Sequence, residues 1–291
     1  MSQLVEQLIN GLAAGANYAI IAIAYNLVFG VLNVFNFAHG ATMMIGTYGV
    51  LLVVQGMGGG FTLAVVVGLL IAGTTGFLIE RLVVRPVGGN QWAVAVSTIG
   101  AAIFIENLVR RLTHARPEVF PRPFELHYLS LPGGADVSTL QIALVVVSVG
   151  LMLGMVALLQ RTRLGKAIRV IAQSPELGRC LGIDVARVVT LTFVVASLLG
   201  GAAGILNGLA YGSTYPYIGS YLGLKGFVVL IVAGVGNMRG ALVIGLALGI
   251  AESLAVGFVG STYRDFVAYG GLVLVLLFRP SGLFGEEVRV V

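Results

Sequence analysis

The chain has 291 residues, of which 58% are hydrophobic and only 10% are charged, and its formal net charge is +5. An ordinary soluble protein carries about 25% charged residues, so this composition excludes a soluble enzyme, and its hydrophobicity excludes a disordered chain. The basic residues lie between apolar runs rather than on one face, which argues against a nucleic-acid partner. A single cysteine, Cys180, excludes an internal disulfide and a cysteine-clustered metal site. What remains is a polytopic membrane protein.

Apolar runs follow one another along almost the whole chain. Residues 1–7 contain no Lys or Arg and so lack the positive region of a cleaved signal peptide, and the first run is expected to remain as a span. A transmembrane helix needs about 20 mostly apolar residues. The shorter run 225–236 either crosses or re-enters, so we expect an all-α polytopic membrane protein with eight or nine transmembrane helices. The eight longer runs are 8–29, 38–55, 61–79, 92–109, 139–160, 188–211, 241–260 and 262–278.

Basic residues are spread unevenly over the segments between these runs. Segment 161–187 contains six of them, against Glu176 and Asp184 as its acidic residues. Because cytoplasmic loops carry the excess of Lys and Arg, we place this segment in the cytoplasm. Counting back places segment 110–138 and the N-terminus outside, and the C-terminus falls inside if 225–236 crosses. Segment 110–138 contains four arginines of its own, but the cluster at 161–187 is denser and decides the orientation.

Two apolar stretches are interrupted by a similar pattern. Residues 30–41 read GVLNVFNFAHGA and residues 234–241 read GVGNMRGA; each opens with Gly-Val, places Asn three residues after that glycine and closes with Gly-Ala. In transporters built from repeats, interrupted segments in corresponding halves point to the substrate path. We therefore expect broken or re-entrant segments near 30–40 and 225–240. The candidate pathway residues are Asn33, Asn36, His39, Gly40, Gly234, Gly236 and Asn237.

The first interruption can be interpreted in two ways. If it is helical, Asn33, Asn36 and His39 share one face; alternatively, Asn36 caps a helix that starts near residue 38. Polar groups at membrane depth find partners or line a cavity. A broken helix would offer its N-terminal amides to a carboxylate, whereas a capped loop would be structural only. Whether His39 or the intramembrane carboxylate Glu252 contacts a solute stays open.

The glycines divide into packing positions and turn positions. A ladder at four-residue spacing is assigned to helix packing, because small residues let backbones approach closely in lipid. Its members are Gly200, Gly204, Gly208 and Gly212. Neither the stretch 234–240 nor Gly165-Lys166 has the spacing of a dinucleotide or phosphate-binding motif, so we expect no cofactor bound by this chain. The sequence also offers no catalytic cluster and no metal site, so we do not expect an enzyme.

Segment 161–187 carries a more specific signal. Its run RTRLGKAIRVIAQSPELGRCLGID is amphipathic up to Pro175 and ends in an apolar Leu-Gly-Ile. The run resembles the cytoplasmic coupling loop of branched-chain amino acid ABC transporter permeases, with the LIV-type H subunits closest and the urea and short-chain amide permeases as near relatives. Three landmarks extend the resemblance over essentially the whole chain: INGLAAGANYA at 9–19, LNVFNFAHG at 32–40 and RPSGLFG at 279–285.

The resemblance implies a single transmembrane permease domain, 1–291, with a periplasmic loop at 110–138 and the cytoplasmic coupling loop at 161–187. Such a chain would form the pore of an ATP-driven importer that moves branched-chain or other small neutral amino acids across the bacterial inner membrane. Its implied partners are a periplasmic solute-binding protein, two cytoplasmic ATPase subunits that use ATP and Mg, and a second permease subunit, either a paralogue or a second copy. The coupling residues would be Arg161, Arg163, Gly165, Ala167, Arg169, Pro175, Leu181, Gly182 and Ile183.

Two other functions stay open at this point. The chain could be a permease for urea or short-chain amides within the same ABC family, because the binding protein normally sets the solute. An ion-coupled secondary transporter is less favoured, since the spans contain no spaced acidic series that would relay protons.

Overall fold

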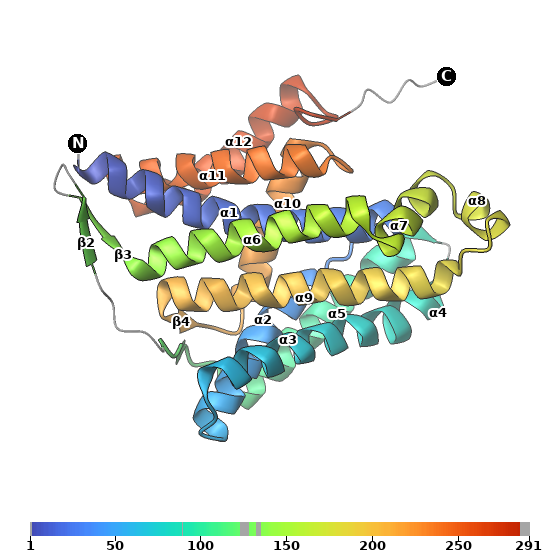
Figure 1. The fold of residues 1–291 in the computed structure, drawn as a ribbon, viewed down its shortest axis with the longest axis horizontal. Coiled ribbons are helices and arrows are strands. Elements are labelled where there is room, and N and C mark those ends of the chain that lie inside the picture. The colour runs from blue at the N-terminus through green and yellow to red at the C-terminus, as the bar shows by residue number, and fades with distance from the viewer. Residues whose placement is uncertain (1, 89, 123–127, 132–134, 286–291) are drawn as a thin grey trace. The chain divides into compact units, whose positions relative to one another are not determined.

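The computed structural model describes residues 2–88, 90–122, 128–131 and 135–285, and this part of the chain is mainly helical (Figure 1). The longer helices are α1 (Ser2–Leu32), α2 (His39–Leu51), α3 (Phe61–Leu78), α5 (Gln91–Leu112), α6 (Thr139–Arg161), α7 (Arg163–Gln173), α9 (Val185–Tyr211), α10 (Ile218–Ala233), α11 (Met238–Phe258) and α12 (Arg264–Phe278). The short helical elements are the π-helical turns η1 (Leu52–Gly56) and η2 (Ile79–Val84), α4 (Arg85–Val87), α8 (Pro175–Cys180) and the 3-10 turn η3 (Ser261–Tyr263).

Two small antiparallel strand pairs accompany the helices. Strand β1 (Glu118–Val119) pairs with β4 (Ser213–Thr214), so that Glu118 lies opposite Thr214. Strand β2 (Tyr128–Leu131) pairs with β3 (Ala135–Ser138). Predicted segment 110–138 therefore contains three of the four strands, while its residues 123–127 and 132–134 lie outside the described part of the chain.

Within the described residues, seven helices are long and apolar enough to cross a membrane. They are Gln3–Leu32, Phe61–Val87, Gln91–Leu112, Thr139–Arg161, Val185–Tyr211, Met238–Phe258 and Ser261–Phe278, and α10 is a shorter apolar helix. The predicted all-α polytopic class is confirmed, and the number of helices is close to the expected eight or nine. Helix α2 accounts for much of the difference, because only 13 residues of the run 38–55 are α-helical before η1 continues the helix. Through η2 and α4, the helix that begins at Phe61 also runs to Val87, beyond the predicted end at 79.

The chain clusters into two compact units, each made of non-contiguous segments. The first unit comprises residues 1–26, 124–152 and 224–291, and the second comprises residues 27–123 and 153–223. Helices α1, α6 and α10 each contribute to both units. The single permease domain expected from the sequence remains a prediction.

Glycine contacts bring the helices of the second unit together. A Cβ added to Gly46 of α2 would lie 2.7 Å from the Cα of Gly201 in α9, and one added to Gly68 of α3 would lie 2.6 Å from the carbonyl oxygen of Gly46. Real Cβ atoms do not approach so closely, so larger residues would push these backbones apart. Helices α2, α3 and α9 thus pack at the short distances that small residues allow in lipid.

The predicted glycine ladder lies on α9. An added Cβ would meet the ring of His39 at Gly200, the carbonyl of Met43 at Gly204 and the ring of Phe120 at Gly208. Gly212 instead ends α9 in the left-handed conformation, at φ +68°, beside the Arg122 guanidinium.

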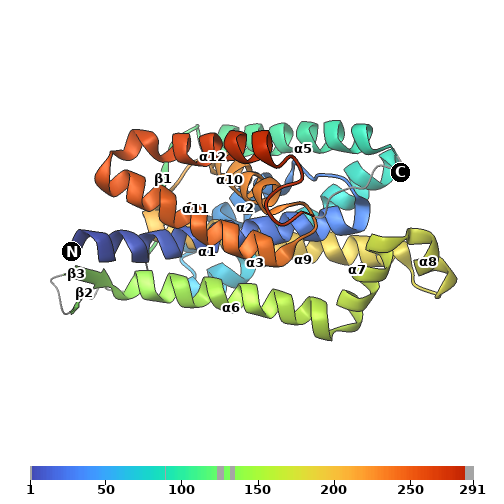
Figure 2. The same ribbon diagram turned by 90° about the horizontal axis from the view of Figure 1, so that it is seen from above.

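The first unit has its own glycine contacts, between α11 and the N-terminal half of α1 (Figure 2). A Cβ on Gly249 would lie 2.2 Å from the backbone nitrogen of Gly15, and one on Gly245 would lie 2.8 Å from Ala19. A Cβ on Gly11 would lie 2.6 Å from the Cα of Ile250. Small residues at four-residue spacing on both helices therefore form one continuous contact.

Both predicted interruptions are real breaks between helices. Helix α1 ends at Leu32 and α2 starts at His39; helix α10 ends at Ala233 and α11 starts at Met238. We call residues 33–38 the first break and residues 234–237 the second break. The first break, residues 33–38, lies in the second unit. The second break, residues 234–237, lies in the first unit.

Candidate functional site

The first break is not helical, so the interpretation in which its polar residues share one helical face is wrong. Asn33 follows the end of α1 with a positive φ of 54°, and its side chain is exposed, whereas Asn36 and His39 are buried. The Asn36 Oδ1 accepts a hydrogen bond from the Ala38 amide at 3.1 Å. Asn36 therefore closes the turn that leads into α2, which agrees with the capping alternative in its position although Ala38 is the residue at the N-cap.

The residues after this break are held by α9, α10 and α5. The His39 ring packs on Gly200, where an added Cβ would lie 2.9 Å from its Cε1. A Cβ on Gly40 would lie 2.3 Å from the carbonyl oxygen of Gly219. The Phe37 amide donates to Thr98 Oγ1 at 3.3 Å. The structure thus brings Asn36, His39 and Gly40 together in a closely packed polar turn and places Asn33 away from them.

The second break is shaped by two glycines and fixed by two asparagines. Gly234 and Gly236 adopt φ values of +93° and +89°. The Gly236 amide donates to Asn26 Oδ1 of α1 at 2.7 Å. Asn237 caps α11, because its Oδ1 accepts from the Gly240 amide at 2.8 Å, and its Nδ2 donates to the Phe284 carbonyl at 2.9 Å.

The C-terminal sequence RPSGLFG, which had no predicted contact, closes this break. Leu283 and Phe284 donate their amides to the carbonyls of Val232 and Ala233 at the end of α10, at 2.8 and 3.1 Å. A Cβ on Gly234 would lie 2.4 Å from the Gly285 nitrogen. The landmark at 279–285 therefore has a structural reason: its Leu283 and Phe284 amides donate to the open carbonyls at the end of α10.

Segment 161–187 forms two short helices between α6 and α9 (Figure 1). A side-chain cap marks the start of α7, of α8 and of α9. Thr162 accepts from the Gly165 amide, Ser174 from the Leu177 amide and Asp184 from the Arg187 amide. Helix α7 is amphipathic, with Gly165, Ile168 and Ile171 buried. These caps define the start of each helix, so the segment is helical rather than an irregular loop.

The predicted coupling residues fall into a contact with the end of α6, in which Gly165 is buried and Arg169 is exposed, and an exposed turn. Gly165 lies against the end of α6, where an added Cβ would be 2.2 Å from the Leu159 carbonyl oxygen, and the Arg169 Nη1 donates to that same carbonyl at 2.9 Å. Between α8 and α9, Leu181 is 69% exposed and Gly182 has φ +74°. The other members lie on the surface or half-buried along these helices: Arg161, Arg163, Ala167, Pro175 and Ile183.

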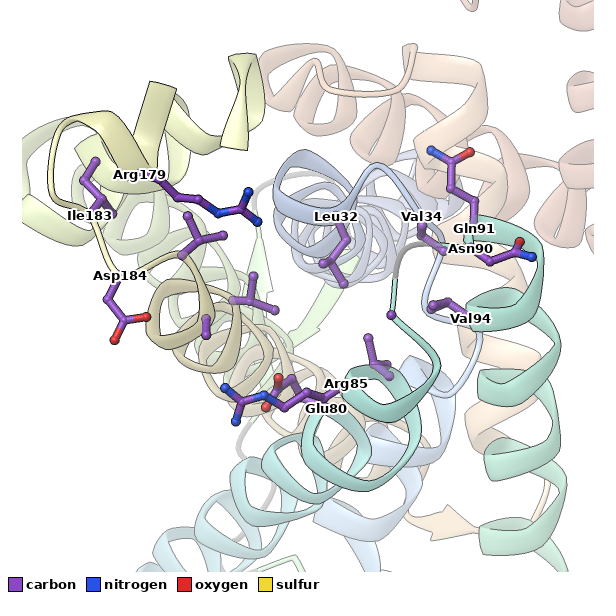
Figure 3. A pocket seen from close by; sticks show the side chains of 15 residues that line it. Leu32, Val34, Glu80, Arg85, Asn90, Gln91, Val94, Arg179, Ile183 and Asp184 are labelled. Carbon is purple, nitrogen blue, oxygen red and sulfur yellow. The ribbon is translucent and has the colours of Figure 1, made fainter. Parts of the chain in front are cut away.

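A cavity of about 660 Å³ opens beside this turn, entirely within the second unit (Figure 3). It is bounded by the end of α1, by η2 and α4, by the start of α5 and by the residues from α8 into α9. Figure 3 shows the Arg179 guanidinium directed toward Leu32. Sequence reasoning did not find this cavity, because its walls come from four separate stretches of the chain.

The first unit contains a buried ion cluster that the sequence analysis did not predict. Lys225 of α10 is fully buried, and it pairs with Glu252 of α11 and, at 2.8 Å, with Asp265 of α12. The Arg264 Nε donates to Glu252 Oε2 at 3.1 Å, and the Tyr18 hydroxyl of α1 donates to the same oxygen at 2.9 Å. Two cations and two carboxylates thus balance across α10, α11 and α12, with α1 joined through Tyr18.

One signal could have found this cluster. Lys225 lies within an apolar stretch, and a buried cation requires a carboxylate partner. The sequence offers Glu252 and Asp265 in the two following spans, but only the tertiary contacts show that both pair with the same lysine. Because Glu252 is held by Tyr18, Lys225 and Arg264, its visible role is to join helices.

The described residues contain no group of three His, Cys, Asp or Glu side chains placed to hold a metal ion. Long apolar helices interrupted by polar breaks dominate the described part of the chain. This architecture is that of a polytopic membrane protein. The family described as "Branched-chain amino acid transport system / permease component" matches residues 7–277. The chain belongs to this family.

Individual relatives agree with that assignment. The high-affinity branched-chain amino acid transport system permease protein BraD of Pseudomonas aeruginosa is 36% identical, over 97% of this chain and 95% of its own. The LivH permease protein of the corresponding system in Escherichia coli K12 is 35% identical with the same coverage. A probable LivH of Methanocaldococcus jannaschii is 26% identical over 92% of this chain and 88% of its own. The resemblance to the LIV-type H subunits is therefore confirmed, and the chain is a multi-pass membrane protein.

One solved structure aligns more distantly. The PsaBC complex from Streptococcus pneumoniae, determined with a Fab, covers 96% of this chain and 91% of its own at a TM-score of 0.46 and 13% identity. That likeness is too weak to carry a structural argument.

Proposed function

We propose that this chain is the pore-forming permease subunit of an ATP-driven importer of branched-chain or other small neutral amino acids in the bacterial inner membrane. The observation that carries the proposal is the 34–36% identity, over 97% of the chain, to permease proteins of high-affinity branched-chain amino acid transport systems. The solute passes beside the two helix breaks, where Asn36, His39 and Gly40, and Gly234, Gly236 and Asn237, interrupt otherwise apolar helices.

ATP hydrolysis belongs to two cytoplasmic partner subunits, which bind ATP and Mg. We assign their docking site to the turn between α8 and α9. A leucine that is 69% exposed, at the tip of a segment with capped helices, is suited to insert into a cleft of another protein. A periplasmic solute-binding protein delivers the amino acid, and a second permease subunit completes the pore.

The proposed orientation places segment 161–187 and the C-terminus in the cytoplasm and the N-terminus and segment 110–138 outside. It is supported by the excess of basic residues at 161–187. Cys180 tests it, because this single cysteine is free and exposed. In intact cells, Cys180 should react with a membrane-permeant maleimide and stay unreactive toward an impermeant one. Ready labelling by the impermeant reagent would show that segment 161–187 lies outside and that the orientation is opposite to the one proposed.

Uptake by the reconstituted complex tests the function. Proteoliposomes are prepared with this chain, its permease partner and the ATPases, with the ATPases facing the lumen. They should accumulate labelled leucine when ATP is in the lumen and the binding protein is outside. Accumulation should persist when ionophores dissipate ion gradients. ATP-independent accumulation that ionophores abolish would indicate an ion-coupled transporter, and uptake of urea or acetamide in place of leucine would assign the chain to the amide permeases.

A further inference from the structure

The cavity of the second unit has no role in the proposed transport step, yet two arginines line it. Arg85 of α4 and Arg179 of α8 belong to its walls. Among the described residues, the side chain of neither arginine forms an ion pair or a hydrogen bond. A guanidinium offers up to five donors in a fork that matches phosphate or carboxylate oxygens, so both groups remain available to an anion.

The two carboxylates in the same walls are already engaged. Glu80 is buried in η2, and its Oε2 accepts from the Thr190 hydroxyl at 2.9 Å. Asp184 caps α9 by accepting from the Arg187 amide at 3.0 Å. Each carboxylate therefore has a protein donor, whereas the donors of Arg85 and Arg179 have no acceptor among the described residues.

Most of the remaining lining is apolar, and Asn90 and Gln91 at the start of α5 are its uncharged polar members. Leu32 and Val34 at the first break, Val94 of α5 and Val189 of α9 contribute hydrocarbon surface. A small inorganic anion would leave this surface without contacts. A ligand with a charged head and an apolar body would use both parts of the lining.

An exposed tryptophan beside the cavity indicates at which depth the cavity would lie in a membrane. Trp92, the one tryptophan of the chain, follows the cavity residues Asn90 and Gln91 and is 83% exposed. Tryptophan is enriched at the interface between the bilayer and water, at the depth of the lipid headgroups. Exposed Leu82, on η2, provides apolar surface near the same edge.

We propose that this cavity binds the headgroup phosphate of an anionic phospholipid, with Arg85 and Arg179 as its ligands and the acyl chains outside along α5 and η2. The inference rests on the proposed orientation, which places the cavity at the cytoplasmic leaflet. Basic pockets between transmembrane helices on that side are suited to anionic lipid headgroups.

Such a lipid would be linked to the ATPase docking site. Arg179 and Ile183, which line the cavity, flank the exposed Leu181 and Gly182 turn. Occupying the cavity would hold this turn at a fixed depth in the membrane. The lipid would then favour productive ATPase docking without touching the solute.

Lipid binding to the purified chain gives a direct test. The chain is stripped of lipid in an uncharged detergent, and binding of phosphatidylglycerol and of phosphatidylcholine is measured by native mass spectrometry. We expect one phosphatidylglycerol to bind in preference to phosphatidylcholine. Each basic residue near an anionic lipid contributes about a fivefold factor, so Arg85→Gln with Arg179→Gln should weaken phosphatidylglycerol binding about 25-fold.

Matched controls come from the same segments. Arg81 of η2 and Arg187 of α9 are exposed and do not line the cavity, so Arg81→Gln with Arg187→Gln should leave binding within about twofold. Arg85→Lys with Arg179→Lys keeps the charge and should retain most of the binding. Unchanged melting temperatures of all three variants establish that the folded chain is compared.

Three results would overturn the proposal. The first is equal binding of the two lipids, and the second is undiminished phosphatidylglycerol binding in the Gln pair. The third is displacement of the lipid by millimolar inorganic phosphate, which would make a soluble phosphate the ligand. None of these measurements requires transport, so failure of the lipid proposal is distinguishable from failure of the permease function.

Discussion

The two units of the chain treat their buried carboxylates differently. In the first unit, Glu252 is neutralised by Lys225 and Arg264, and the pairing extends over α10, α11 and α12. In the second unit, Glu80 and Glu106 are also buried, but each accepts a hydrogen bond from a hydroxyl, of Thr190 and Ser220 respectively.

This difference indicates which contacts hold each unit together. Ion pairs in a poorly solvated site are costly to break, because removing one partner leaves an uncompensated charge. The second unit has single hydroxyl bonds at these carboxylates, and helices pack on glycine in both units. We therefore expect the first unit to be the more sensitive to loss of charge, and the second unit to depend mainly on the small volume of its glycine contacts.

The largest effect should follow from Lys225→Met. It leaves Glu252 and Asp265 without their shared cation, and breaking a buried ion pair costs about 3–5 kcal/mol. The expected result is a large loss of folded protein and a strongly lowered melting temperature in detergent.

Lys166→Met is its matched control, because Lys166 is exposed on α7. It should change stability by less than about 0.5 kcal/mol. If both lysine variants melt alike, the ion cluster does not hold the first unit together.

An intermediate effect is expected for Gly40→Ala in the second unit. The new Cβ would lie 2.3 Å from the Gly219 carbonyl oxygen, and overpacking of this kind costs about 1–3 kcal/mol. Gly30→Ala adds the same methyl group where no atom lies within 4 Å. It should be neutral or stabilise α1 by up to about 1 kcal/mol.

The midpoint of unfolding of each alanine variant, measured in increasing concentrations of a denaturing detergent, gives the difference in stability between them. Equal midpoints for Gly40→Ala and Gly30→Ala would show that the first break tolerates volume, contrary to the contrast between the units.

The smallest effect concerns the two break asparagines. Asn237→Ala removes an N-cap and a bond to the C-terminal segment, so it should cost about 1–2 kcal/mol. Asn36→Ala removes one local bond to Ala38, which is worth about 0.5–1.5 kcal/mol. Hydrogen exchange at the start of α11 and of α2 reports the loosening, and a greater loss of protection in Asn36→Ala would contradict the assignment.

The helical class and both breaks could be predicted from the sequence, because runs of apolar residues and their interruptions are local features. The shared sequence pattern of the two breaks does not correspond to a shared structure. Asn33 and Asn237 occupy the same place in the pattern, but Asn33 follows the end of α1 at φ +54°, whereas Asn237 begins α11 as its cap. The shared pattern does not give the two asparagines the same conformation.

Other features depend on tertiary contacts and could not be read from spacing. The partners of Lys225 come from two later helices, and the cavity walls come from four stretches. The helix that starts at Phe61 passes Glu80 and Arg81 through a π-helical turn, although the apolar run ends at residue 79. Hydropathy alone places the end of a span where charge begins, whereas the buried Glu80 continues the helix and accepts a hydrogen bond from the Thr190 hydroxyl.

ATP-driven uptake should depend on the turn between α8 and α9, where we propose that the ATPase docks. The most direct measurement is ATP-dependent leucine uptake by proteoliposomes whose complete complex contains Leu181→Asp, since this side chain is exposed and its replacement should leave the fold intact. We expect uptake to fall to the level seen without ATP, while Arg187→Gln keeps it near that of the unaltered chain. Undiminished ATP-driven uptake by the Leu181→Asp complex would contradict the account.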